Sequence, residues 1–279
     1  MPDRAEVEQE ICVERARYFT ESFRRSEAEP LIIRRARALA NVLGKMTVFI
    51  KPGELIAGKQ AGALRAAPVF PEFAVDWIFE EIDKLAARQA DRFTVRLETQ
   101  EEHLEICRWW KGKTVQDRFL ATLPPDVLEA CRMGVLSATG NMTSGDGHIM
   151  LDFPKVLAVG GRGIIREAED RLGRLDPGDP ASVHQRHVVE SIPIVYAAVI
   201  RFAARYAELA ERRGSGCRAP RGAGAVLAEE EEHPGARRIP ARLNALMAFA
   251  STLTLLPGLA ILLCQRLHGC YGGEDDITR

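Results

Sequence analysis

The feature that most restricts the fold of this chain is a long run of apolar residues at helical spacing near residue 200. Successive members of the run are three or four residues apart throughout, which is the period of one face of an α-helix. The members are Val188, Ile192, Val195, Val199, Phe202, Tyr206 and Leu209. The pattern predicts a long helix that buries one face and bends near Pro193.

Shorter helical patterns precede this run. Residues 7–23 combine spaced apolar positions with many Arg and Glu, which predicts an amphipathic helix with a solvated outer face. Pro30 begins a second helix, whose arginines at 34, 35 and 37 face solvent or a neighbour. Its inward positions are Ile32, Ala36, Leu39 and Leu43. Further helices are expected at 101–110, 117–123, 124–134 and 164–175.

The segments between the helices are short and varied. Residues 47–50 are β-branched or aromatic, a Pro-Gly turn follows, and residues 55–59 form a second short β segment. A loop then leads into a helix with Phe73, Trp77, Ile78, Ile82 and Leu85 on one face. Residues 91–99 are expected as a short strand or loop, and the glycine-rich residues 137–163 as loop and turn with brief regular structure. The predicted fold class is mainly α with short β segments.

Charge balance, the N-terminal residues and the cysteines argue against a nucleic-acid-binding protein and an exported protein. The 279 residues carry 38 basic and 39 acidic side chains, a net charge of -1, so no nucleic-acid partner is expected. The first residues lack the apolar core of a signal sequence, and the six cysteines are scattered without a CxxC pair. The thiols are therefore expected to be reduced and the protein cytoplasmic.

The C-terminal part of the sequence differs from the rest. Residues 212–240 are rich in Gly, Ala and Arg without periodicity and are predicted to be a flexible linker. Residues 241–279 hold an apolar segment and a polar tail, and no charge occurs between Leu243 and Gln265. That run is long enough for a membrane span. A core segment is favoured instead, because Pro257-Gly258 divides the run and no aromatic belt flanks it.

Few residues qualify as a functional site. The sequence contains no GxSxG, Walker A, HExxH or Rossmann signature, so no catalytic residue and no metal site are assigned. Residues 160–163, Gly-Gly-Arg-Gly, fit an anion cradle or a tight turn, with the turn favoured. His184 and His187 fit a metal pair or a solvated pair, with the solvated pair favoured.

His148 is the stronger candidate. It ends a Gly-Asp-Gly-His run ahead of an apolar segment, where the backbone leaves room for a ligand. An imidazole there can exchange hydrogen bonds with a substrate hydroxyl or carbonyl near neutral pH. From the residues alone, a structural loop histidine remains the competing interpretation.

A family resemblance adds to this interpretation. The motifs are ICVERARYFTESF, EPLIIRRARALANVL, residues 47–81, WWKGKTVQDR and GHIMLDFPKVLAVGGRGI, in that order. Together they resemble the N-terminal region of glycyl radical enzymes, the pyruvate formate-lyase (formate acetyltransferase) family. The glycerol dehydratase and choline trimethylamine-lyase branch is the more similar one. The resemblance implies that residues 1–211 are the N-terminal part of a ten-stranded α/β barrel.

The resemblance also implies a chemistry. It gives His148 a substrate-binding role toward a small molecule, in an enzyme of anaerobic metabolism. It implies a protein glycyl radical installed by a radical S-adenosylmethionine activating enzyme, and a homodimer is among the expected assemblies. The family's Gly-Cys-x-Glu and Arg-Val-x-Gly-Tyr motifs do not occur here, and Cys270 lies four residues before Glu274 instead of two.

Two functional hypotheses follow from that difference. The first is the N-terminal portion of a radical dehydratase or lyase, as a fragment that is inactive alone. The second is a non-catalytic, truncated paralogue that acts as a helical binding module.

Overall fold

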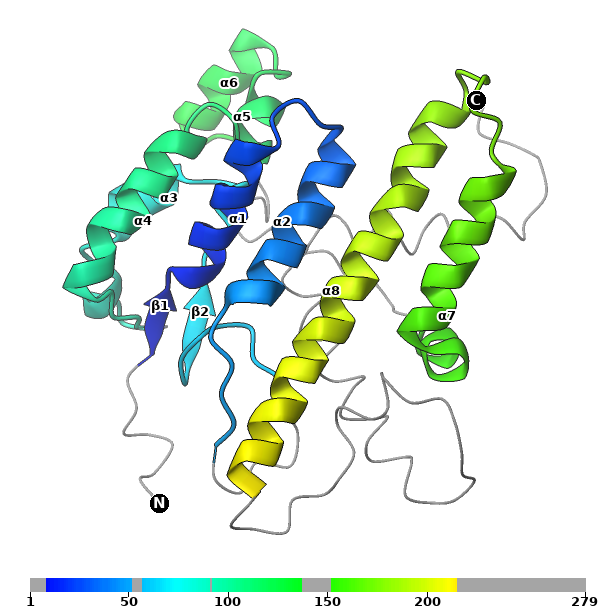
Figure 1. Cartoon of the computed structure of the whole chain (residues 1–279). Helices are drawn as coiled ribbons and strands as arrows, with labels where there is room; N and C mark the ends of the chain where they lie inside the picture. Colours follow the sequence, from blue (N-terminus) through cyan, green and yellow to red (C-terminus); the bar gives the residue numbers. More distant parts are fainter. Residues whose placement is uncertain (1–8, 52–56, 91, 137–151, 215–279) are drawn as a thin grey trace. The chain divides into compact units, whose positions relative to one another are not determined.

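The secondary structure is almost entirely helical, as the computed structural model of the chain shows (Figure 1). It describes residues 9–51, 57–90, 92–136 and 152–214. In chain order the elements are β1 (Glu10–Cys12), α1 (Glu14–Arg25), α2 (Leu31–Lys45), β2 (Ala66–Pro68), α3 (Asp76–Glu81), η1 (Leu85–Ala87), α4 (Leu97–Trp110), α5 (Val115–Leu120), α6 (Pro125–Arg132), α7 (Phe153–Arg174) and α8 (Ser182–Gly214). The predicted fold class, mainly α with short β segments, is confirmed.

The chain forms two compact units. The first consists of residues 1–21 and 60–146, and the second of residues 22–59 and 147–279. The division falls within α1, whose last turn belongs to the second unit. Each unit is considered by itself below.

The first unit contains a small parallel sheet that the sequence pattern did not predict. Strand β1 pairs with β2, with Glu10 opposite Ala66, and Thr94 forms an isolated bridge to Glu10. The prediction of one helix from residue 7 was therefore wrong for Glu10–Cys12. The backbone amides of Glu10 and Ile11 donate to the carbonyls of Arg65 (3.1 Å) and Thr94 (2.9 Å). These partners are distant in sequence, so local periodicity does not reveal them.

Two other boundaries in this unit differ from the prediction. The apolar face expected from Phe73 to Leu85 is divided between α3 and η1, and its fully buried members are Ile78, Ile82 and Leu85. Helix α4 begins at Leu97, inside the range predicted as strand or loop. Helix α6 starts at a Pro-Pro pair and is followed by Gly134 at φ 73°, as predicted.

The second unit is built on α8, with α2 and α7 packed against it (Figure 1). The predicted face of α8 is confirmed, because every member from Val188 to Tyr206 is buried. The predicted inward positions of α2 are buried too. Residues 47–50, predicted as a β segment, form no strand. The second predicted segment, residues 55–59, lies partly outside the described ranges. β-branched residues favour a strand only where a partner is available.

Helix α8 is the one described helix whose length and apolar content, over Ser182–Ala210, would allow it to cross a membrane. A core helix passes the same test, and α8 packs against two neighbours. The charge-free run from Leu243 to Gln265 and the predicted linker from residue 215 onward lie outside the described residues.

Arg205 on α8 ties that helix to the end of α2. Its two terminal guanidinium nitrogens donate to the carbonyls of Leu43 and Met46, each at 2.6 Å. We expect Arg205→Met to lower the free energy of unfolding by about 1–3 kcal/mol, because carbonyls at a helix C-terminus lose a charged donor. Urea unfolding measures this effect. The exposed Arg201 on the same helix is the matched control, and an equal loss in Arg201→Met would contradict the assignment.

Candidate functional site

The predicted substrate-binding residue, His148, lies outside the described residues. What the structure describes is the element that follows it, helix α7, which begins five residues later at Phe153.

Helix α7 has a well-defined start. The carboxylate of Asp152 accepts a hydrogen bond from the backbone amide of Lys155 at 3.0 Å, which satisfies one of the free amides at a helix N-terminus. Pro154 occupies the first turn, where its missing N–H costs nothing. The prediction of loop and turn through residue 163 was therefore wrong from Phe153 onward, because an aspartate cap and a proline start a helix there.

The helix is sharply interrupted at Gly160. This residue has φ 65° and ψ 175°, a backbone conformation that is open to glycine and strained for other residues. The first turns of α7 consequently run at an angle to the rest of the helix (Figure 1). Of the two interpretations of residues 160–163, the structure supports a tight turn.

The next two glycines of the run serve packing. A Cβ at Gly161 would lie 3.3 Å from the Ile200 side chain on α8, so glycine lets the two helices approach closely. A Cβ at Gly163 would lie 2.7 Å from Cβ of Val159. Val159 precedes the interruption, so this contact shows that the chain turns back on itself there.

We expect Gly163→Ala to lower the free energy of unfolding by about 1–3 kcal/mol, because the new methyl group overlaps Val159. Thermal unfolding followed by circular dichroism measures the effect. The matched control is Gly173 on the same helix, where a new methyl group would meet no described atom within 4 Å. Gly173→Ala should raise the stability by up to about 1 kcal/mol. Equal losses in the two variants would contradict this description of the turn.

No metal site is found among the described residues. Within those ranges no group of three or more His, Cys, Asp or Glu side chains is arranged to hold an ion. His184 is exposed and His187 half-buried at the start of α8. The favoured interpretation of these histidines as a solvated pair agrees with their exposure.

A buried ion pair lies in the first unit. Arg15, 1% exposed, donates through its two terminal nitrogens to the Glu72 carboxylate at 2.9 and 2.5 Å. Its guanidinium lies 4.6 Å from the ring centroid of Phe19 and 4.0 Å from that of Phe70. The sequence pattern had placed the arginines of this helix on a solvated face, which is wrong for Arg15. With both charges mutually satisfied, the pair is suited to holding the unit together.

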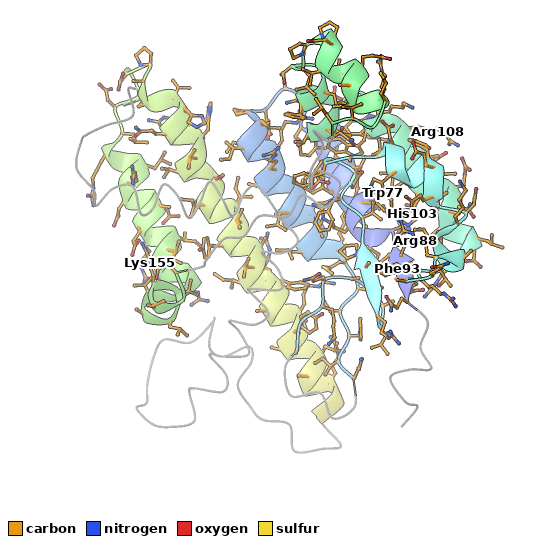
Figure 2. All side chains as sticks on the ribbon, turned by 180° about the vertical axis from the view of Figure 1, so that it is seen from behind. Trp77, Arg88, Phe93, His103, Arg108 and Lys155 are labelled. Carbon is orange, nitrogen blue, oxygen red and sulfur yellow. The ribbon has the colours of Figure 1, made fainter. Side chains whose placement is uncertain are left out.

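His103 on α4 is also buried, and sequence reasoning did not identify it (Figure 2). Its Nε2 atom has no hydrogen-bond partner among the described residues. Burial lowers the pKa of His103 to about 4 from an ordinary value of 6.5; the nearby Glu102 opposes this shift and Arg17 adds to it. The signal that could have found it is its helical spacing with Ile106, Cys107 and Trp110, all of them buried.

The thiols of Cys107 and Cys12 are not activated. Burial raises the pKa of Cys107 to about 12. Burial also raises the pKa of Cys12, against the opposing effect of backbone hydrogen bonds from Gly62 and Glu14. A thiol with a raised pKa is a poor nucleophile near neutral pH. Cys217, Cys264 and Cys270 lie outside the described residues.

The neighbouring tryptophans Trp109 and Trp110 behave as packing residues. Trp110 is buried, and its indole nitrogen donates to the hydroxyl of Thr20 at 2.8 Å. The ring of Trp109 meets it edge-on and lies 3.9 Å from the ammonium group of Lys113. The prediction that Trp110 packs instead of stacking on a ligand is confirmed.

Comparison with known proteins gives a consistent picture. The family model described as "Pyruvate formate lyase-like" matches residues 3–225. A probable dehydratase, YbiW, of Escherichia coli strain K12 is 40% identical over 204 residues, which are 73% of this chain and 25% of that protein. The chain thus spans about a quarter of the length of this curated relative, and it covers the N-terminal portion.

Two solved structures extend the comparison to the fold. The glycerol-bound B12-independent glycerol dehydratase of Clostridium butyricum matches with a TM-score of 0.80 at 29% identity, over 90% of this chain and 33% of that chain. A glycyl radical enzyme of Archaeoglobus fulgidus matches with a TM-score of 0.77 at 25% identity, over 97% and 37% of the respective chains. The expected relation to an N-terminal part of a glycyl radical enzyme barrel is confirmed.

Proposed function

Because this chain belongs to the pyruvate formate lyase-like family, we propose that it forms one wall of the substrate site of a glycyl radical dehydratase or lyase. His148 is the substrate-binding group in this proposal, and the substrate is a small hydroxylated molecule. The observation that carries the proposal is the match over residues 3–225, which includes both the Gly-His run and α7.

The residues near the proposed site support a role in binding. Neutral imidazole both donates and accepts hydrogen bonds, so one histidine can bind a substrate hydroxyl at neutral pH. Four positions after His148, the Asp152 cap gives α7 a defined start. Rigid elements next to a binding residue are what a precise site needs.

In the proposed enzyme, the groups that bind the substrate differ from the groups that carry the radical. Hydrogen-atom abstraction would be supplied by a protein glycyl radical and a thiyl-forming cysteine. Cys107 and Cys12 do not fit that part, because Cys107 is buried and burial raises the pKa of both thiols. In this proposal the part of the enzyme formed by this chain would bind and orient the substrate through His148.

The wider setting is part of the same proposal. A radical S-adenosylmethionine enzyme would be the activating partner, and the working assembly would be a cytoplasmic homodimer under anaerobic conditions. Residues 1–211 would be the family portion, residues 212–240 a linker, and residues 241–279 a separate apolar segment.

Glycerol binding to the 279-residue chain tests the role of His148. We expect glycerol to shift the imidazole Cε1–H resonance of His148 in NMR spectra, with saturation in the millimolar range typical of a small ligand with few contacts. The variant His148→Ala should lose the response of the remaining resonances to glycerol. His184→Ala, which removes an exposed histidine, should keep it. Identical responses in the two variants would refute the assignment.

A further inference from the structure

Helix α4 of the first unit packs against α1 and α3 along one face only (Figure 1). The buried residues of the helix lie three or four positions apart and therefore share that face: His103, Ile106, Cys107 and Trp110. Residues 97–102, all of which the structure describes, include no buried residue. His103 is thus the first buried side chain of α4, and the turns before it rest on the unit without an apolar anchor of their own.

The His103 imidazole is enclosed in a form that suits only the neutral ring. Its side chain is 1% exposed, and its Nε2 atom has no hydrogen-bond partner among the described residues (Figure 2). Both ring nitrogens are donors once the imidazole is protonated. Protonation would therefore place a positive charge and an N–H without an acceptor inside the face that α4 buries, which is strongly unfavourable.

The charged groups nearest to His103 do not compensate for that charge. The Glu102 carboxylate accepts two hydrogen bonds from Arg17 on α1, one of them from Nη2 at 2.6 Å, so it is committed to a guanidinium. The other buried charges that α1 brings, on Arg15 and its partner Glu72, satisfy one another. Burial and the charge of Arg17 lower the pKa of His103, and Glu102 opposes them only in part.

Helix α3 and the rest of the buried face of α4 add no partner for a protonated imidazole. The acidic residues of α3 are Asp76, which lies 3.8 Å from Lys111, Glu80, which is exposed, and Glu81, which pairs with Arg88. The thiol of Cys107 is neutral, because burial raises its pKa to about 12. Among the described residues, the charges that act on the pKa of His103 are those of Glu102 and Arg17.

We propose that His103 makes the attachment of α4 sensitive to acid: when the imidazole is protonated, the part of α4 from Leu97 to His103 separates from α1. The separation brings the charged ring into water. The C-terminal end of α4 stays attached, because the indole nitrogen of Trp110 donates to the buried hydroxyl of Thr20 at 2.8 Å. The proposal is independent of the function proposed for His148.

The direction of the effect follows from proton binding. A histidine in water has a pKa of 6.5, whereas the buried ring has a pKa of about 4, so the open form binds a proton at pH values at which the closed form does not. Between pH 7 and pH 5 this difference raises the fraction of open molecules about 20-fold. So short a helical segment is not stable in water by itself, so opening exposes its amides.

Amide hydrogen exchange of the full chain at pH 7 and pH 5, corrected for the pH dependence of the intrinsic exchange rate, tests the proposal. We expect the amides of residues 101–107, which bond to the carbonyls of the released turns, to lose protection about 20-fold at pH 5. Because a local opening exposes little surface, their exchange should not change with urea up to about 1 M. The amides of α1 and of Lys111, which bonds to Cys107 at the attached end, should remain better protected.

Two variants show whether His103 is the cause. His103→Leu and His103→Gln bind no proton in this range and retain Glu102, so residues 101–107 should exchange at pH 5 within about twofold of their pH 7 protection. His184→Gln, at an exposed position, should behave as wild type. An equal loss of protection in either His103 variant that folds would overturn the proposal. Exchange of residues 101–107 that follows the amides of α1 and accelerates with urea would overturn it too, because the opening would then be global.

Discussion

Replacing Glu72 by glutamine is expected to lower the free energy of unfolding by about 3–5 kcal/mol, the largest effect of a single substitution that we expect in this chain. The carboxylate is the charge partner of Arg15, whose guanidinium is buried between two aromatic rings. Removing the negative charge leaves a positive charge without compensation in a medium of low polarity. Equilibrium unfolding in urea at pH 7 measures the difference.

The exposed ion pair between Arg108 and Glu101 provides the matched control. Its side chains are 56% and 67% exposed, so Glu101→Gln should cost less than about 1 kcal/mol. A double variant, Arg15→Met with Glu72→Leu, removes both buried charges and should be more stable than Glu72→Gln. A loss for Glu72→Gln no larger than that for Glu101→Gln would show that the buried Arg15 charge does not depend on Glu72 for compensation.

The stability of the chain is expected to decrease by about 2 kcal/mol between pH 7 and pH 5 through His103 alone. The unfolded chain binds a proton at this histidine with a pKa of 6.5, whereas burial keeps the pKa in the folded chain at about 4. Acid therefore favours the unfolded state from pH 6.5 downward, and this loss is complete once the pH is below 4.

Unfolding curves at several pH values isolate this contribution. The variant His103→Leu has no proton to bind, so its stability should change less between pH 7 and pH 5, by about the same 2 kcal/mol. His184→Gln, at an exposed position, should follow the wild-type curve. Parallel curves for wild type and His103→Leu would mean that the imidazole is accessible to protons in the folded chain.

Arg15 and His103 show where inference from sequence stops. Arg15 lies in a helix with several other charged residues, and nothing nearby in the sequence distinguishes it from Arg17, which is half-exposed and paired with Glu102. What buries Arg15 is the segment around Phe70 and Glu72, more than 50 residues away. His103 does carry a local signal, since apolar neighbours follow it at helical spacing, but a single polar residue on such a face is easily passed over.

The glycines of α7 also separate what the sequence predicts from what requires the structure. The run at 160–163 was identified as a turn or an anion cradle, and the choice between them required the backbone angles of Gly160 and the contact of Val159 with Gly163. The ion pair between Lys155 and Glu167 could not be expected from sequence, because at a separation of 12 residues it contradicts a straight helix.

The sequence by itself determined the helical content, the buried faces of α2 and α8, the ends of α6 and the family. These properties depend on residues close together along the chain, through the 3.6-residue period, capping and motif order. Only the tertiary structure decided that Glu10–Cys12 is a strand, that Arg15 and His103 are buried, and that α7 folds back on itself. Each of these depends on which distant segments meet, because burial and strand pairing are properties of both partners and neither partner's local sequence contains the other.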